Sequence, residues 1–115
     1  MSCDDIRWMP GSFRKTPETL AAARLIGERI TARQEELKIT QQELADLVWV
    51  TPSLIRFLQR GTRLLRGPLL RRIEAALLWR SGTMAGWIEE ELPDFAPCFK
   101  EIMYEYSPVR TRGTE

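Results

Sequence analysis

Histidine is absent from this 115-residue chain, and cysteine occurs only as Cys3 and Cys98. Because histidine is the side chain that titrates near neutral pH and a common zinc ligand, acid–base and zinc chemistry lose their usual groups. The two cysteines lie near opposite ends of the chain, which is more typical of free thiols in a reducing compartment than of a disulfide framework. We therefore predict free thiols, no metal site, no cofactor and no enzymatic activity.

Long hydrophobic runs are also missing, since no stretch approaches the about 20 apolar residues that a membrane-spanning helix needs. The N-terminal sequence MSCDDIRWMPGS has early acidic residues and no apolar segment, so it does not resemble a secretory signal. A hydrophobic fraction of 43% and a charged fraction of 29% are ordinary for one globular domain. We expect a cytoplasmic protein with no membrane partner.

No catalytic constellation stands out. Glu89, Glu90 and Glu91 are consecutive, so they diverge around a helix and cannot converge as paired catalytic carboxylates do. Ser53 and Ser81 have no histidine to activate them, and no glycine-rich phosphate-binding loop occurs. We predict no catalytic residue.

The net charge of +1 conceals a division of charge along the chain. Residues 20–80 contain eleven basic and six acidic side chains, a net charge of +5, whereas residues 81–115 contain three basic and seven acidic ones, a net charge of −4. A local basic patch attracts phosphates whatever the total charge is. A solvated face with no partner is the alternative explanation.

The most informative stretch is residues 41–60, QQELADLVWVTPSLIRFLQR, which has the pattern of two short helices joined by a tight turn. Small Ala45 stands where the two helices would approach each other. The apolar positions of the stretch are Leu44, Val48, Val50, Ile55 and Leu58. This pattern predicts a helix-turn-helix, in which the first helix crosses the nucleic-acid backbone and the second enters the major groove.

Start and stop signals set the expected helix boundaries in this region. Thr16-Pro17 and Thr51-Pro52 each combine a capping hydroxyl with proline at the first helical position, and they predict helices from 17 to about 37 and from 52 to about 60. Thr40 and Glu43 form a capping box that predicts a helix from 41 to about 48. Gly27, which costs helix propensity, suggests close packing by a neighbouring helix.

Later helices follow from weaker signals. Pro68 begins a fourth helix that we expect to run to about 80, Ser81 would cap a fifth (82–91), and Asp94 would cap a sixth (95–104). The fold class is therefore all-α, a compact domain of five to six helices. We divide it into a flexible N-terminal arm (1–16), a helix-turn-helix domain (17–80), a C-terminal helical extension packed on it (81–106) and a loose tail (107–115).

Helical spacing puts Ser53, Arg56, Phe57 and Arg60 on the outer faces of the second motif helix. Arg56 has the geometry to bind guanine or a phosphate, and Phe57 can touch a thymine methyl or pack under a neighbour. Arg60, Arg63 and Arg66 place three guanidinium groups within seven residues, which suits phosphate clamping.

Residues from about Leu20 to Trp79, with Gln41, Ala45, Val50, Ile55 and Gly61 at their characteristic spacings, resemble the Cro and lambda-repressor type of helix-turn-helix domain, the xenobiotic-response-element family. Members usually have glycine where this chain has Trp49, so the turn is either strained or takes a different path. The LLWRSGTMAGWIEE junction resembles the corresponding junction in regulators of this family from actinobacteria and their phages. The resemblance implies that DNA is bound or bordered by Gln41, Gln42, Thr51, Pro52, Ser53, Arg56 and Phe57. The guanidinium cluster adds Arg60, Arg63 and Arg66 to the predicted DNA-binding positions.

By this resemblance the expected function is a sequence-specific regulator that binds a double-stranded DNA operator. The resemblance favours a repressor, such as a phage immunity repressor or a bacterial regulator, acting in a bacterial cell or phage-infected host. Two alternatives stay open: an antitoxin that holds a toxin with its C-terminal helices, and a protein-binding adaptor that no longer touches DNA. The C-terminal helices either extend the core or pair two subunits as a homodimer.

Overall fold

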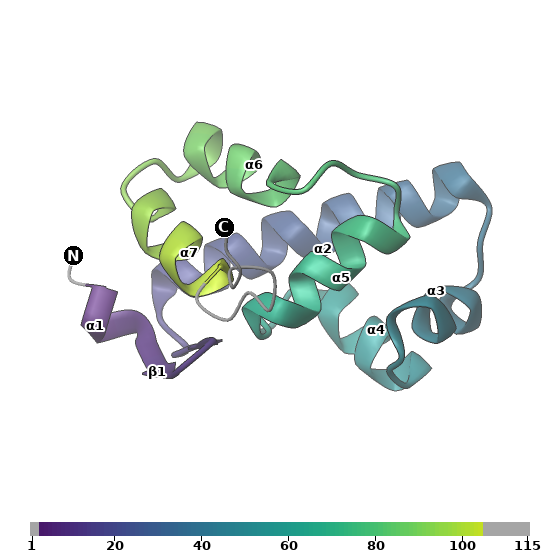
Figure 1. The fold of residues 1–115 in the computed structure, drawn as a ribbon, viewed down its shortest axis with the longest axis horizontal. Coiled ribbons are helices and arrows are strands. Elements are labelled where there is room, and N and C mark those ends of the chain that lie inside the picture. Colours follow the sequence, from purple (N-terminus) through teal and green to yellow (C-terminus); the bar gives the residue numbers. More distant parts are fainter. Residues whose placement is uncertain (1–2, 105–115) are drawn as a thin grey trace, which may run out of the picture.

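The computed structural model describes residues 3–104, and the predicted tail at 107–115 lies outside them. Seven helices and one two-stranded hairpin follow in the order α1 (Cys3–Ile6), β1 (Arg7–Met9), β2 (Ser12–Phe13), α2 (Pro17–Leu37), α3 (Gln41–Val48), α4 (Pro52–Arg60), α5 (Gly67–Ala76), α6 (Thr83–Glu91) and α7 (Ala96–Met103). The all-α class is confirmed. Figure 1 shows α2 running behind most of the other helices.

The boundaries of the first three predicted helices are confirmed at α2, α3 and α4. Thr16 and Thr51 accept hydrogen bonds from the amides of Thr19 and Leu54, as N-caps do. At α3 the capping box is complete, because Thr40 Oγ1 accepts from the amide of Glu43 at 3.0 Å and the Glu43 carboxylate accepts from the amide of Thr40 at 2.8 Å. The register of the motif therefore rests on hydrogen bonds at both helix starts.

Three later boundaries were predicted wrongly. Helix α5 ends at Ala76, four residues early, because Leu78 takes the left-handed conformation with φ of 62°. Neither Ser81 nor Asp94 caps a helix; the N-cap residues of α6 and α7 are Gly82 and Phe95, and neither of them makes a side-chain cap. The local sequence did not reveal these boundaries, because no glycine marks the left-handed Leu78 and the N-cap residues of α6 and α7 have no capping side chain.

At α6 the capping group is a carboxylate from another helix. Glu74 of α5 is buried, and its two oxygens accept from the amides of Met84 at 2.8 Å and Gly82 at 3.3 Å. A negative group at a helix N-terminus is favourable, because the free amides there carry partial positive charge. This contact joins α5 to the C-terminal helices.

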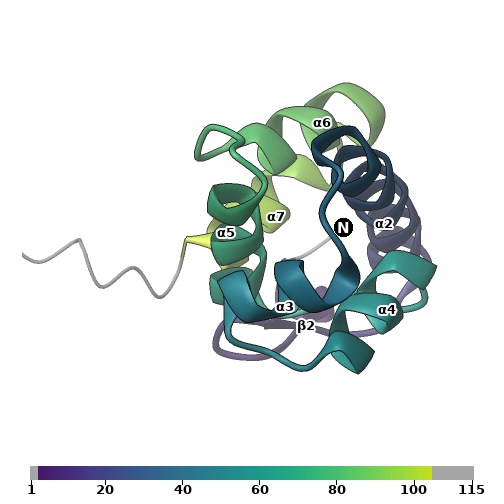
Figure 2. The same cartoon turned by 90° about the vertical axis from the view of Figure 1, so that its right-hand side faces the viewer.

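The core is continuous from the N-terminal segment to α7. Figure 2 shows α2, α5 and α6 arranged around its centre, with α7 behind. Phe13, Phe95 and Phe99 are buried with ring centroids 5.8–6.2 Å apart, so residues from both ends of the described chain share one aromatic cluster. Trp79, half-buried, packs edge-on against Trp87 at 4.8 Å. No helix among residues 3–104 is both long and apolar enough to span a membrane.

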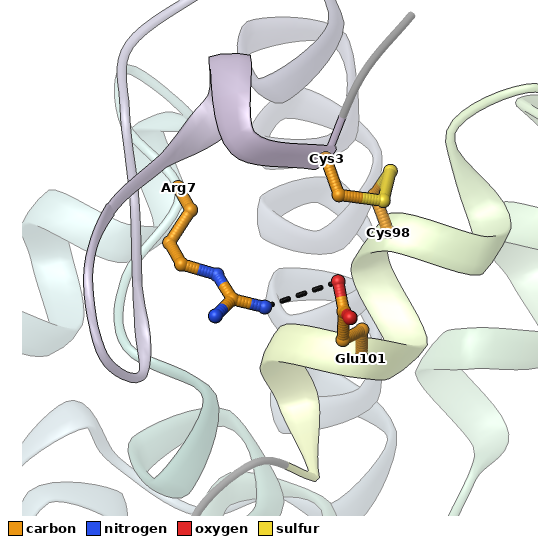
Figure 3. Close-up of a disulfide and its surroundings, with 4 residues drawn as sticks. All are labelled: Cys3, Arg7, Cys98 and Glu101. Atoms are coloured by element: carbon orange, nitrogen blue, oxygen red, sulfur yellow. Dashed lines mark ion pairs between the residues drawn. A yellow bond between two sulfur atoms is a disulfide. The ribbon is translucent and has the colours of Figure 1, made fainter.

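Residues 3–13, predicted as part of a flexible arm, are packed on the body. Ile6 and Phe13 are buried, and the amide of Gly67 donates to the carbonyl of Gly11 at 3.0 Å. Arg7 pairs with Glu101 of α7 at 3.0 Å (Figure 3). The segment is ordered because it packs against α7, as Phe13 does on Phe99, and sequence periodicity could not reveal this contact.

The prediction of free thiols was also wrong, because Cys3 and Cys98 form a disulfide (Figure 3). Their Cα atoms are 5.2 Å apart across a sequence separation of 95 residues. Spacing in sequence gave no hint of this pairing, since it depends on α1 lying against α7. The bond encloses almost the whole described chain in one covalent loop.

Removing the disulfide should lower the free energy of unfolding by about 2–4 kcal/mol, because the unfolded chain regains the freedom that a long closed loop denies it. Urea unfolding of wild type and Cys98→Ser, each with and without reductant, measures this. Reductant should shift the wild type and leave Cys98→Ser unmoved. Equal wild-type midpoints in both conditions would contradict the prediction.

The buried Glu74 carboxylate makes stability depend on pH. Burial raises the pKa of Glu74 above the usual 4.5, while the two amide hydrogen bonds and Arg71 act the other way. Between the ordinary and the raised pKa, the folded state keeps a proton that the unfolded state has released. Its contribution to stability therefore falls as pH rises through this window.

Glu74→Gln, which does not titrate, isolates the effect. The stability of wild type relative to Glu74→Gln should decline as pH rises from about 4.5 through the raised pKa, as measured by urea unfolding at a series of pH values. Other carboxyl groups cancel in this difference. A difference that is constant or grows with pH would show that Glu74 is not held in this way.

Candidate nucleic-acid interface

Helices α3 and α4 are fixed against α2 by a close backbone approach. A Cβ atom on Gly27 would lie 2.7 Å from the carbonyl oxygen of Leu58 and 2.9 Å from that of Gln59, so only glycine allows α2 and α4 to meet here. This confirms the close packing predicted at Gly27. Gly61 ends α4 with φ of 69°, and its Cβ position lies against the backbone of Arg24. These two glycines allow the close approach that fixes the position of α4 against α2.

A chain of three glutamines crosses the same junction. Gln41 Nε2 donates to Gln59 Oε1 at 2.6 Å, and Gln59 Nε2 donates to Gln34 Oε1 at 2.5 Å. All three side chains are half-buried, so the chain joins α2, α3 and α4 where water is partly excluded. Gln59 is the central member, and its side-chain amide both donates and accepts, as this position in the chain of hydrogen bonds requires.

The leading end of α4 is open to solvent. Thr51, Ser53 and Arg56 are exposed, and an Arg56 guanidinium nitrogen donates to the Ser53 hydroxyl at 3.1 Å. Pro52 and Phe57 are half-buried at its sides. The hydrogen bond to Ser53 holds the guanidinium group over the first turns of α4, the part of the helix that a groove would meet first.

Three further guanidinium groups continue this surface, because Arg60, Arg63 and Arg66 are all exposed. The Arg63 guanidinium carbon lies 5.3 Å from the centre of the Trp8 ring, a cation–π contact with the N-terminal hairpin. In Figures 1 and 2 the hairpin and α4 lie at the same lower edge of the molecule. We did not predict Trp8 as a support for Arg63, since nothing in the sequence connected them.

The two glutamines predicted to contact DNA, Gln41 and Gln42, differ in how far their side chains are free to bind a ligand. The Gln41 side-chain amide donates to Gln59, so one face of it is used inside the fold. Gln42 is exposed, and its Nε2 donates to Asp46 at 2.9 Å on the same helix. Both lie in the first turn of α3, where their own backbone amides are not used by the capping box and can meet an anion.

The ten predicted residues thus lie in two neighbouring groups. The first turn of α3 carries the two glutamines, and α4 with the following loop carries the others. Within residues 3–104, no group of three or more His, Cys, Asp or Glu residues could hold a metal ion. The surface presents guanidinium, hydroxyl and amide donors, a composition suited to phosphates and base edges.

Comparison with known protein families supports a helix-turn-helix in this region. The family model described as Helix-turn-helix matches residues 30–77, from the second half of α2 through the residue after α5. A helix-turn-helix domain is therefore present, and the match supports a DNA-binding regulator. No curated protein and no solved structure gave a match.

The glutamine chain predicts energetic coupling between α3 and α4. Gln41→Ala and Gln59→Ala should each lower the free energy of unfolding by about 0.5–1.5 kcal/mol, and the double variant should lose less than the sum, because both singles break the same hydrogen bond. Urea unfolding of all four proteins measures the coupling. Gln42, whose side chain bonds to Asp46 instead, gives the matched control: its effects should add to those of Gln59. If the effects of Gln41→Ala and Gln59→Ala also add, as those of Gln42→Ala and Gln59→Ala should, the glutamines do not couple α3 to α4.

Proposed function

We propose that the protein is a sequence-specific double-stranded DNA-binding transcriptional regulator that acts as a repressor. The observation that supports this best is the exposed start of α4, where Arg56 is oriented by Ser53 beside exposed Arg60, Arg63 and Arg66. In this proposal α4 enters the major groove and Arg56 contacts a base pair. The first turn of α3 and the loop after α4 bind phosphates on either side.

Repression in this proposal is steric, because a protein that covers an operator overlapping a promoter excludes polymerase. The setting we propose is a phage immunity repressor or a bacterial regulator inside the cell that carries the operator. A homodimer through the C-terminal helices stays a prediction. The large exposed hydrophobic side chains of residues 3–104 lie outside α6 and α7, whose apolar residues fill the core instead.

Salt dependence tests the proposal. A duplex recovered by selection from a random-sequence pool should lose roughly 10²-fold in affinity between 50 and 200 mM salt, as expected for about four phosphate contacts. An adaptor that binds proteins through an apolar groove would recover no such duplex. Failure to enrich any duplex, or affinity independent of salt, would rule out the proposed function.

Two arginine substitutions separate base from phosphate contacts. Arg56→Ala should weaken binding to the selected duplex by about 1–3 kcal/mol and reduce discrimination against altered sites, because a base contact is lost. Arg63→Ala should weaken all duplexes similarly and reduce the magnitude of the salt slope by about 1. Titrations on the selected duplex and on single-base variants measure both.

Arg80→Ala is the matched control, because Arg80 is an exposed arginine in the connection between α5 and α6, which lies at the upper side of Figures 1 and 2, away from α4. It should leave both affinity and sequence preference within twofold of wild type. Arg56→Ala with unchanged sequence preference would show that this α4 register is wrong.

A further inference from the structure

Trp49 combines two unfavourable features at one position. It ends α3 in the left-handed backbone conformation, with φ of 66° and ψ of 46°, which residues other than glycine rarely adopt. Its indole is also 84% exposed, the largest exposed fraction among the large hydrophobic residues in the described part of the chain. Neither feature helps the folded monomer, so an explanation has to come from something the indole touches.

The turn itself does not require tryptophan. The Trp49 and Val50 amides donate to the carbonyl of Ala45, and these backbone bonds form with any residue that tolerates the conformation. Glycine would make the same bonds without the steric cost. The buried neighbours Val48 and Ile55 fill the core without the indole. The side chain therefore contributes to a surface, and not to the fold.

The position of Trp49 beside the start of α4 indicates what its side chain contacts. Trp49 comes two residues before Thr51, the N-cap of α4, and the α3–α4 connection lies at the lower edge of the molecule in Figures 1 and 2, as α4 does. The exposed groups that follow it are Thr51, Ser53 and Arg56. A flat apolar ring with one N–H donor, standing next to this row of donors, matches the wall of a DNA groove.

We propose that Trp49 is a DNA-contacting residue, whose indole packs against the sugar–phosphate edge or a thymine methyl where α4 enters the major groove. The indole Nε1–H then has a phosphate or base acceptor within reach, as a Trp N–H buried at an interface usually does. This rests on the proposed DNA-binding function and adds to it an apolar contact that the arginines do not provide. Trp49 stabilises the complex at a cost to the free protein.

Leu78 supplies a matched control. It is likewise left-handed, with φ of 62°, and 73% exposed, but it lies in the connection between α5 and α6, at the upper side of Figures 1 and 2. Glycine at either position removes the same kind of backbone strain and the same kind of exposed apolar side chain. The two substitutions differ in whether they remove a contact to DNA.

The experiment measures thermal unfolding and affinity for the selected duplex in Trp49→Gly and Leu78→Gly. Both should unfold cooperatively, at midpoints roughly 2–4 °C above wild type, because strain is relieved. Trp49→Gly should bind the duplex about 5- to 100-fold more weakly, whereas Leu78→Gly should bind within twofold of wild type. Trp49→Asn, which tolerates the left-handed conformation without an apolar ring, should lose affinity as Trp49→Gly does.

The outcomes separate this proposal from the function on which it rests. If the wild-type protein enriches no duplex, both the proposed function and the proposed role of Trp49 are rejected. If wild type, Trp49→Gly and Trp49→Asn all bind the duplex equally well, only the proposed role of Trp49 is rejected. A change of sedimentation behaviour in Trp49→Gly with DNA affinity intact would assign the indole to a protein interface and overturn the proposal.

Discussion

The backbone contact between α2 and α4 at Gly27 is the constraint on which the rest of the site depends. The carbonyl oxygens of Leu58 and Gln59 lie 2.7 and 2.9 Å from where a Cβ atom would be, so the two helices approach to a distance that no larger residue permits. The glutamine chain then joins α3 to the same crossing. These contacts fix the position of α4 against α2 and α3, and with it the positions of the exposed Arg56 and Arg60.

Sequence reasoning predicted the helix-turn-helix because its signals are local. Thr40 and Thr51 fix the helix starts through neighbouring amides, and Gly61 fixes an end through its own φ angle. Contacts between distant residues gave no such signal. The buried Glu74 that caps α6 belongs to another helix, and no glycine marks the left-handed conformation at Leu78 that follows the end of α5 at Ala76, so these boundaries were missed.

The N-terminal segment shows the same division between local and distant information. Its few apolar side chains have no period, yet Ile6 and Phe13 complete the core, and Cys3 is bonded to Cys98. This anchoring places Trp8 under Arg63, so the segment supports one of the proposed phosphate contacts. At the proposed DNA surface, helical spacing predicted the outward positions of Arg56 and Arg60, and clustering in the sequence predicted the contribution of Arg63 and Arg66. The hydrogen bond that uses Gln41 inside the fold came only from the structure.

The most direct test of the central claim is a map of amide chemical shifts during titration with the selected duplex. If α4 and its flanking groups bind DNA, the large shifts should be confined to the first turn of α3, residues 49–60 and the loop through Arg66, with α6 and α7 unchanged. Shifts concentrated on α6 and α7, with α4 unaffected, would contradict the account and place the partner on the opposite side of the molecule.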